Sequence, residues 1–192
     1  RALGGFDRKA IAVAGTTGYT GATTINAGTF ALRGGGTIDR SSVVNLAGAG
    51  AVFDISGSSG TQTIRDLTGI SGTTIDLGAN GLVVGTSGTS TFSGSIGGAG
   101  GLTMAGPGTL TLTGGNTYGG GTTVTAGTLS VSSQTNLGLT SGGLTLDGGT
   151  LQTTTNMNIG HSVTLGAGGG TFSPNGVLGV FGDAASAVAA MT

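Results

Sequence analysis

Glycine recurs about once in every four residues of this chain, and between the glycines apolar and polar side chains alternate. The 192 residues include 45 glycines, and each glycine inside a helix costs about 0.8–1 kcal/mol relative to alanine. A helical fold is therefore disfavoured along nearly the whole chain. Alternation with a period of two places apolar side chains on one face of a β-strand, and glycine permits tight corners between strands. The pattern predicts an all-β chain built from many short strands.

Two stretches share this pattern so closely that they align without a gap. Residues 11–32 read IAVAGTTGYTGATTINAGTFAL and residues 110–131 read LTLTGGNTYGGGTTVTAGTLSV, with eight of 22 positions identical. The apolar positions match in kind. In the second copy, Leu110 and Leu112 are predicted to face inward, and the threonines beside them outward.

A shorter pattern, two strands flanking a glycine-rich corner, occurs three more times. It reads VNLAGAGAVF at residues 44–53, IDLGANGLVV at 75–84 and VTLGAGGGTF at 163–172, and LTLDGGTLQ at 144–152 is a compact relative. Sequences typical of two-residue hairpin loops are few. Short strands joined by irregular corners predict a parallel β-helix, or solenoid, of about seven coils with three strands per coil. Inward rows of Val, Leu and Ile would form its continuous core.

The stretch 92–131 also carries a long ordered series of motif residues. In this series it resembles the passenger-associated transport repeat of Gram-negative autotransporters, the autotransporter-associated β-strand repeat family. Residues 11–32 look like a degenerate second copy, with Tyr19 and Gly28 in place and Thr17 where the motif has Asn. The positions that carry the resemblance are Phe92, Gly94, Ile96, Gly98, Gly100, Leu102, Gly106, Gly108, Thr109, Leu110, Leu112, Gly114, Asn116, Tyr118, Gly120, Thr122, Val124, Gly127, Thr128 and Leu129.

The resemblance implies a right-handed parallel β-helix, which we expect over residues 1–182. It also implies export across the outer membrane through a C-terminal β-barrel of the parent chain, followed by secretion or display at the cell surface. Members of the family are largely adhesins and other surface virulence factors, and the repeat is associated with passenger folding and transport. Residues 183–192 depart from the pattern, and a short helix with Asp183 as N-cap, a further strand or a terminal cap all remain open.

Charge and cysteine content exclude several classes of function. The chain has six Lys and Arg and seven Asp and Glu. Six cations are too few for a nucleic-acid-binding surface. The chain has no cysteine, so it has neither disulfides nor thiolate zinc sites. The glycine-rich stretches match neither a phosphate-binding loop nor a calcium-binding nonapeptide. We expect no cofactor, no metal and no catalytic residues, and we interpret the chain as a stalk or adhesin scaffold that can meet host or bacterial surface ligands.

A few side chains suggest other chemistry. Asp54 and Asp76 are 22 residues apart, about one coil, so they could stack on one face as the carboxylate pair of a polysaccharide-active enzyme. This is the alternative function. His161 is the only histidine, too few for a triad or a two-histidine metal site, and it is predicted to be an exposed corner residue. Tyr19 and Tyr118 are expected to pack over a coil corner. Free strand edges at the two ends of the stack make lengthwise self-association a further expectation.

Overall fold

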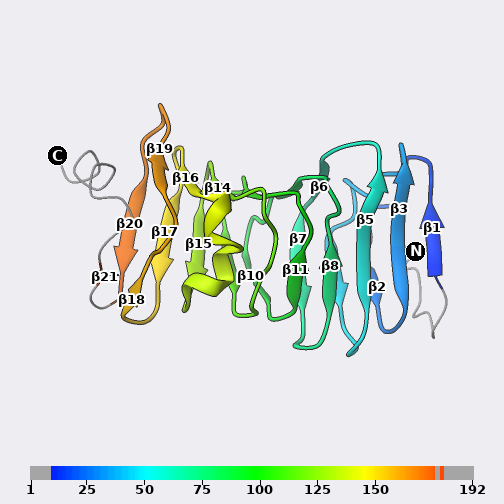
Figure 1. The fold of residues 1–192 in the computed structure, drawn as a ribbon. Coiled ribbons are helices and arrows are strands. Elements are labelled where there is room, and N and C mark those ends of the chain that lie inside the picture. Colours follow the sequence, from blue (N-terminus) through cyan, green and yellow to red (C-terminus); the bar gives the residue numbers. More distant parts are fainter. Residues whose placement is uncertain (1–9, 176–177, 180–192) are drawn as a thin grey trace.

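The computed structural model describes residues 10–175 and 178–179, which form a rod of stacked coils (Figure 1). The described chain contains 21 short strands and two 3₁₀ segments, η1 (Gln134–Leu137) and η2 (Thr140–Gly142). Neighbouring strands are parallel, and each sheet takes its strands from successive coils. The prediction of an all-β parallel solenoid is confirmed. The helix or cap considered for residues 183–192 lies outside the described residues.

Each full coil contributes one strand to each of three sheets before the chain rises to the next coil. The first face is a five-stranded sheet with the order β1 (Ala10–Val13), β3 (Thr29–Gly34), β5 (Val52–Ser58), β8 (Thr74–Asp76) and β11 (Ser95–Gly97). The second face is a six-stranded sheet with the order β6 (Gln62–Ile64), β9 (Leu82–Val84), β12 (Leu102–Met104), β14 (Thr122–Val124), β16 (Leu144–Leu146) and β19 (Val163–Leu165).

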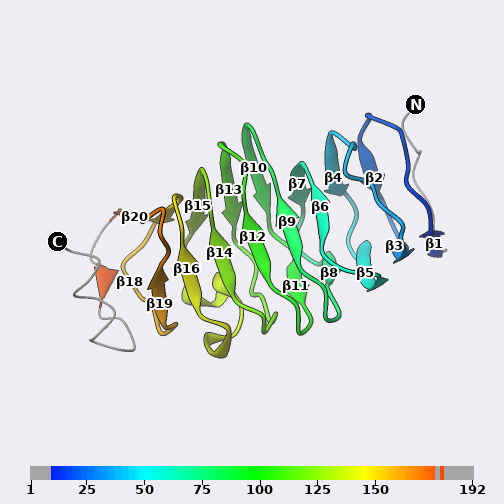
Figure 2. The same ribbon diagram turned by 90° about the horizontal axis from the view of Figure 1, so that it is seen from above.

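The third face is an eight-stranded sheet that runs through the whole described rod, and in Figure 2 it lies behind the six-stranded sheet. Its order is β2 (Thr23–Ile25), β4 (Val43–Leu46), β7 (Asp66–Gly69), β10 (Thr89–Phe92), β13 (Thr109–Leu112), β15 (Thr128–Val131), β17 (Thr150–Thr153) and β20 (Thr171–Pro174). The remaining strands, β18 (Met157–Asn158) and β21 (Leu178–Gly179), pair with each other.

The rod has about eight turns, slightly more than the seven expected. We number the coils 1 to 8, and they span residues 10–25, 29–46, 52–69, 74–92, 95–112, 116–131, 134–153 and 157–174. The expected number was low because some faces lack a regular strand. In coils 1 and 2 the second face has only the bridge between Thr16 and Thr37. In coils 6 and 7 the first face consists of residues 115–118 and of η1.

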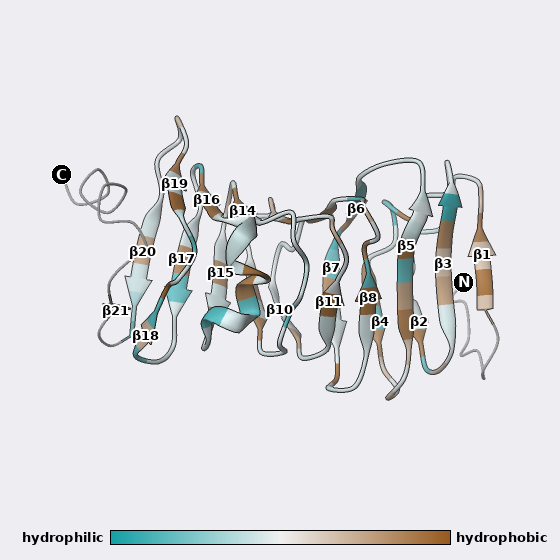
Figure 3. Ribbon diagram, in the orientation of Figure 1, coloured by the Kyte–Doolittle hydropathy of each residue, from teal (hydrophilic) through white to brown (hydrophobic). Residues whose placement is uncertain are grey.

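The apolar side chains of all three faces point into one continuous core. Leu110 and Leu112 are 0% exposed, whereas Thr109 before them and Thr111 between them are only half-buried, as the alternation predicted. The apolar bands in Figure 3 repeat from strand to strand along the rod. Thr153 ends its strand on the same inward row as Leu151 and is 1% exposed.

The short corner pattern builds all three corners of the coil. In residues 44–53 it joins β4 to β5, from the eight-stranded to the five-stranded sheet. Residues 75–84 join β8 to β9, from the five-stranded to the six-stranded sheet, and residues 163–172 join β19 to β20, from the six-stranded to the eight-stranded sheet. The pattern therefore determines a bend between two strands and does not determine which face follows.

Candidate functional site

The motif residues of the second repeat lie where successive coils touch. Leu110, Leu112, Val124 and Leu129 are fully buried in the core, and the half-buried Thr109 and Thr128 pair directly with each other across coils 5 and 6. The glycines lie against the backbone of the coil before. A Cβ on Gly108, Gly114, Gly120 or Gly127 would come within 1.9–2.6 Å of a backbone atom of that coil.

The two tyrosines make the same hydrogen bond in both repeats. The Tyr118 hydroxyl lies 2.6 Å from Thr122 Oγ1, and the Tyr19 hydroxyl lies 2.6 Å from Thr23 Oγ1. Tyr118 is completely buried, and burial raises its pKa, with the Thr122 hydrogen bond offsetting part of the effect. Tyr19 is half-buried and packs against the core. Both tyrosines therefore fix a corner, and the phenol of Tyr118 stays protonated.

Asn116 and its counterpart Thr17 both bind the carbonyl one coil further on. Asn116 Nδ2 donates to the Asn136 carbonyl oxygen at 2.5 Å, and Thr17 Oγ1 donates to the Thr37 carbonyl oxygen at 2.9 Å. Each partner lies 20 residues downstream. The change from Asn to Thr in the first copy thus preserves the contact between coils.

Asn116 also links coil 6 to the coil before it. Its Oδ1 accepts a hydrogen bond from the Ile96 amide at 2.9 Å. Asn136 lies one coil on and is bound differently, since its Nδ2 donates back to the Gly114 carbonyl oxygen at 2.8 Å and its Oδ1 accepts from the nearby amides of Ser132 and Ser133. The side-chain amides of Asn116 and Asn136 thus form a ladder of hydrogen bonds between coils. The ladder lies on the face where the five-stranded sheet has ended.

The two repeats differ in their orientation on the rod. The second copy begins with β13 in the eight-stranded sheet, whereas the first begins with β1 in the five-stranded sheet. Their equivalent strands β14 and β2 lie in the six-stranded and the eight-stranded sheet, respectively. The tyrosine and carbonyl contacts are the same in both copies, but the second copy is displaced by one face around the coil.

The structure brings Asp54 and Asp76 together, as the 22-residue spacing predicted. The two residues pair directly in β5 and β8. Asp54 is engaged by Arg33, whose guanidinium lies 2.5 Å from its carboxylate, and by the hydroxyl and amide of Ser56. Partial burial opposes ionisation of Asp54, but the hydrogen bonds from Arg33 and Ser56 outweigh it and hold the pKa below its usual range. A general acid for glycoside cleavage needs a raised pKa, so this arrangement favours a structural ion pair.

His161 is buried, and the prediction of an exposed corner residue is wrong. It lies between β18 and β19 and is 0% exposed. Its imidazole lies against the backbone of Leu137 and Gly138 in coil 7. Within residues 10–175 and 178–179, no group of three or more His, Cys, Asp or Glu side chains is placed to hold a metal ion.

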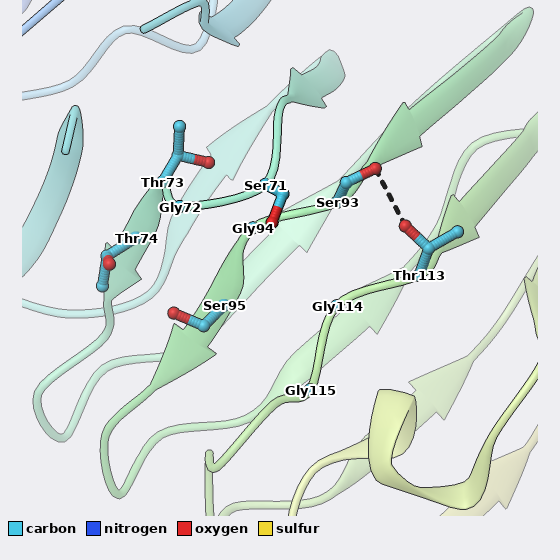
Figure 4. Close-up of a pocket in the computed structure, with 10 residues that line it drawn as sticks. All are labelled: Ser71, Gly72, Thr73, Thr74, Ser93, Gly94, Ser95, Thr113, Gly114 and Gly115. Atoms are coloured by element: carbon cyan, nitrogen blue, oxygen red, sulfur yellow. Dashed lines mark hydrogen bonds between the residues drawn. The ribbon is translucent and has the colours of Figure 1, made fainter. Parts of the chain in front are cut away.

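A polar groove crosses three successive corners between the eight-stranded and five-stranded sheets, and sequence reasoning missed it. Residues 71–74, 93–95 and 113–115 line a volume of about 500 Å³ with serine, threonine and glycine alone (Figure 4). Thr113 Oγ1 donates to Ser93 Oγ at 2.8 Å across the groove, while Thr73 is buried and donates to the Ile70 carbonyl oxygen. The groove forms because glycines occupy corner positions on adjacent coils. Their alignment can be seen only when the register between the coils is known.

Comparison with known proteins gives one family. The passenger-associated-transport-repeat model matches residues 12–32 and 102–131. No curated protein and no solved structure matches the chain significantly. Within the described ranges, no helix has the length and the apolar character that a membrane crossing requires. Both matched segments make the same tyrosine and carbonyl contacts, and residues 12–32 and 102–131 match the passenger-associated transport repeat, the repeat family of autotransporter passengers.

Proposed function

We propose that this chain is a stalk segment of an autotransporter passenger, exported across the outer membrane of a Gram-negative bacterium and then displayed at the surface or released. The observation that carries the proposal is that the motif residues contact neighbouring coils of the rod itself. Asn116, Gly114 and Thr128 contact neighbouring coils. Of these three, Gly114 lines the groove and has no side chain to react there. A motif used for joining coils suits a rod that holds other parts of a passenger away from the membrane.

The same contacts support a role in folding during export. Each coil presents strand edges to the next, so order can propagate along the rod as the chain emerges from its translocator. The second repeat supplies amide and glycine contacts, through Asn116 and Gly114, that hold a new coil to the one before. We propose that the second repeat assists this step, since its ladder begins where the five-stranded sheet ends.

The test is to produce the parent chain in its bacterium with Asn116→Ala combined with Tyr118→Ala. The matched control is Thr117→Ala, because Thr117 is exposed between the two residues. We expect the double variant to lower the amount of protease-resistant passenger at the cell surface, and the control to leave it unchanged. Normal surface amounts with increased protease sensitivity would support the stalk without the export role. Unchanged amount and resistance in the double variant would refute both.

We further propose that the rod serves as an adhesin scaffold, and that the groove over residues 71–115 is the described surface most suited to contact a ligand. The ten lining residues include no charged side chain, which suits neutral sugar hydroxyls. A glycan array of neutral and acidic oligosaccharides probes this. Binding that Thr113→Trp abolishes, at unchanged melting temperature, supports direct contact. No bound glycan would leave adhesion to other parts of the passenger.

A further inference from the structure

His161 is buried against the backbone of Leu137 and Gly138. Its side chain is 0% exposed, and neither Nδ1 nor Nε2 has a hydrogen-bond partner among the described residues. Buried polar atoms in native proteins are nearly always paired, so such a group calls for an explanation. The imidazole must stay neutral to remain where it is, because an unpaired buried charge is strongly unfavourable.

The imidazole belongs to a column of residues from three successive coils. Tyr118 belongs to coil 6. Gly138 of coil 7 packs so closely on the Tyr118 ring that a Cβ on Gly138 would lie 2.6 Å from a ring carbon. The Leu137 carbonyl oxygen accepts a hydrogen bond from Thr122 Oγ1 at 2.9 Å. His161 of coil 8 lies against the backbone of Leu137 and Gly138. Charging the imidazole therefore acts on the contact between coils 7 and 8.

Among residues 111–175, no charged side chain of the elements around His161 can compensate. Residues 111–146, which include η1, η2 and the corner of coil 6, contain no Asp, Glu, Lys or Arg, and Tyr118 is their only titratable side chain. In residues 148–175, on the same coil and the following strand, His161 is the only titratable group. The nearest carboxylate in sequence is that of Asp147, and its Oδ1 accepts a hydrogen bond from the Gly168 amide.

This part of the rod is also held differently from coils 1 to 5. In coils 1 to 5 the first face is a continuous sheet. In coils 6 and 7 this face is held by η1 and by side-chain amides such as that of Asn136. Gln134 Oε1 then accepts a hydrogen bond from the Gly160 amide at 3.0 Å, next to His161. Side-chain hydrogen bonds at a few points resist separation less than a ladder of backbone bonds does.

We propose that His161 is an acid-sensitive latch in the rod, whose protonation loosens coils 7 and 8 while coils 1 to 5 stay ordered. Burial lowers the pKa of His161 below its ordinary value of 6.5, and the backbone of Gly138 and Leu137 offsets only part of this effect. A histidine that binds its proton less readily when folded stabilises the fold above pH 6.5. That stability is lost as the pH falls from 6.5 through the folded-state pKa.

Hydrogen exchange of the 192-residue chain between pH 7.5 and 5.5 tests the latch. After correction for the intrinsic effect of pH, we expect protection of amides in residues 134–165 to fall by up to about tenfold per pH unit below pH 6.5, the limit for one linked proton. Residues 52–97 should keep their protection. His161→Gln, which cannot titrate, should remove the pH dependence. Asp54→Asn serves as control. It should show the same pH dependence as the chain without substitutions, since the pKa of Asp54 lies below its usual range.

A second measurement covers the case in which His161→Gln does not fold. Because His161 is the only histidine of the 192 residues, its imidazole gives a single set of NMR signals in this chain without substitutions. We expect these signals to titrate below pH 6.5, together with the loss of protection in coils 7 and 8. Titration near the ordinary value with unchanged protection would overturn the proposal. So would a loss of protection spread evenly over all coils.

Discussion

At the scale of single residues, glycine sets how closely two coils can approach. Gly114 and Gly115 are neighbours in sequence with opposite surroundings. A Cβ on Gly114 would lie 1.9 Å from the Gly94 carbonyl oxygen, whereas a Cβ on Gly115 would meet no atom within 4 Å. The motif requires glycine at one of these positions because backbone passes directly over it. Composition alone cannot distinguish the two.

This contrast gives a prediction for alanine substitutions. Gly114→Ala should destabilise the rod by about 3 kcal/mol, the upper part of the range for overpacking, because the obstructing atoms belong to backbone. Gly115→Ala should change stability by less than about 0.5 kcal/mol. Urea denaturation followed by circular dichroism measures both. Equal losses for the two variants would show that coil stacking does not depend on this contact.

Alternation makes a second prediction at the residue scale. Leu112→Asp would place an unpaired charge in the core, where Leu112 is 0% exposed, and should prevent cooperative folding or cost more than about 4 kcal/mol. Val124→Asp should act in the same way. Thr111→Asp, on the half-buried outer row, should cost less than about 1 kcal/mol. Melting temperatures compare the three, and similar losses at inner and outer positions would contradict the assignment of faces.

At the scale of elements, the molecule reuses one strand–corner–strand unit on every face. The three copies of the short pattern lie at three different corners, and the two transport repeats begin on different sheets. The coil lengths explain this freedom. Thr109 pairs with Thr128, 19 residues on, whereas Thr29 pairs with Val52, 23 residues on. Similar sequences therefore do not stay in step with the turns of the rod.

The ladder of Asn116 and Asn136 replaces a strand pairing, and its removal should be costly. Asn116→Ala would leave the Ile96 amide and the Asn136 carbonyl oxygen without their partner. Since Asn116 is only 5% exposed, we expect a loss of about 2–4 kcal/mol from two unsatisfied buried groups. Thr17→Ala, which removes one half-buried bond, should cost about 1 kcal/mol. Chemical denaturation of both variants measures the difference, and a smaller loss for Asn116→Ala than for Thr17→Ala would contradict the role of the ladder.

At the scale of the whole molecule, stability is the sum of contacts between neighbouring coils. Within the described residues, β1 and β2 are the first strands of their sheets, and each has one edge that no described strand covers. Uncovered edges of parallel strands are templates for further strands. Lengthwise association of two copies therefore stays a prediction of this architecture.

Analytical ultracentrifugation of the isolated chain tests this association. We expect the mean mass to rise with concentration, and we expect Ala12→Pro to reduce the rise, because proline in the outer strand β1 removes a backbone donor and disfavours strand pairing. The matched control is Ala10→Ser, at the exposed beginning of the same strand. A monomer at every concentration would mean that the edges are covered in solution.

The sequence by itself determined the strands, the inward rows and the kind of corner, because these depend on side-chain alternation and on local glycine geometry. It also identified the two repeats and the stacking of Asp54 on Asp76, since both follow from spacing along the chain. It could not place His161 or the groove. Those depend on which face a corner turns onto and on which residues of other coils lie above and below.

Only the tertiary structure decided these positions, because coils of unequal length set the register between residues about 20 apart. The same register decided that Asp54 is bound to Arg33 and that the imidazole of His161 lies beneath Gly138. A pattern with a period of two records which side of a strand is buried. It holds no information on which residues of the neighbouring coils that strand pairs with.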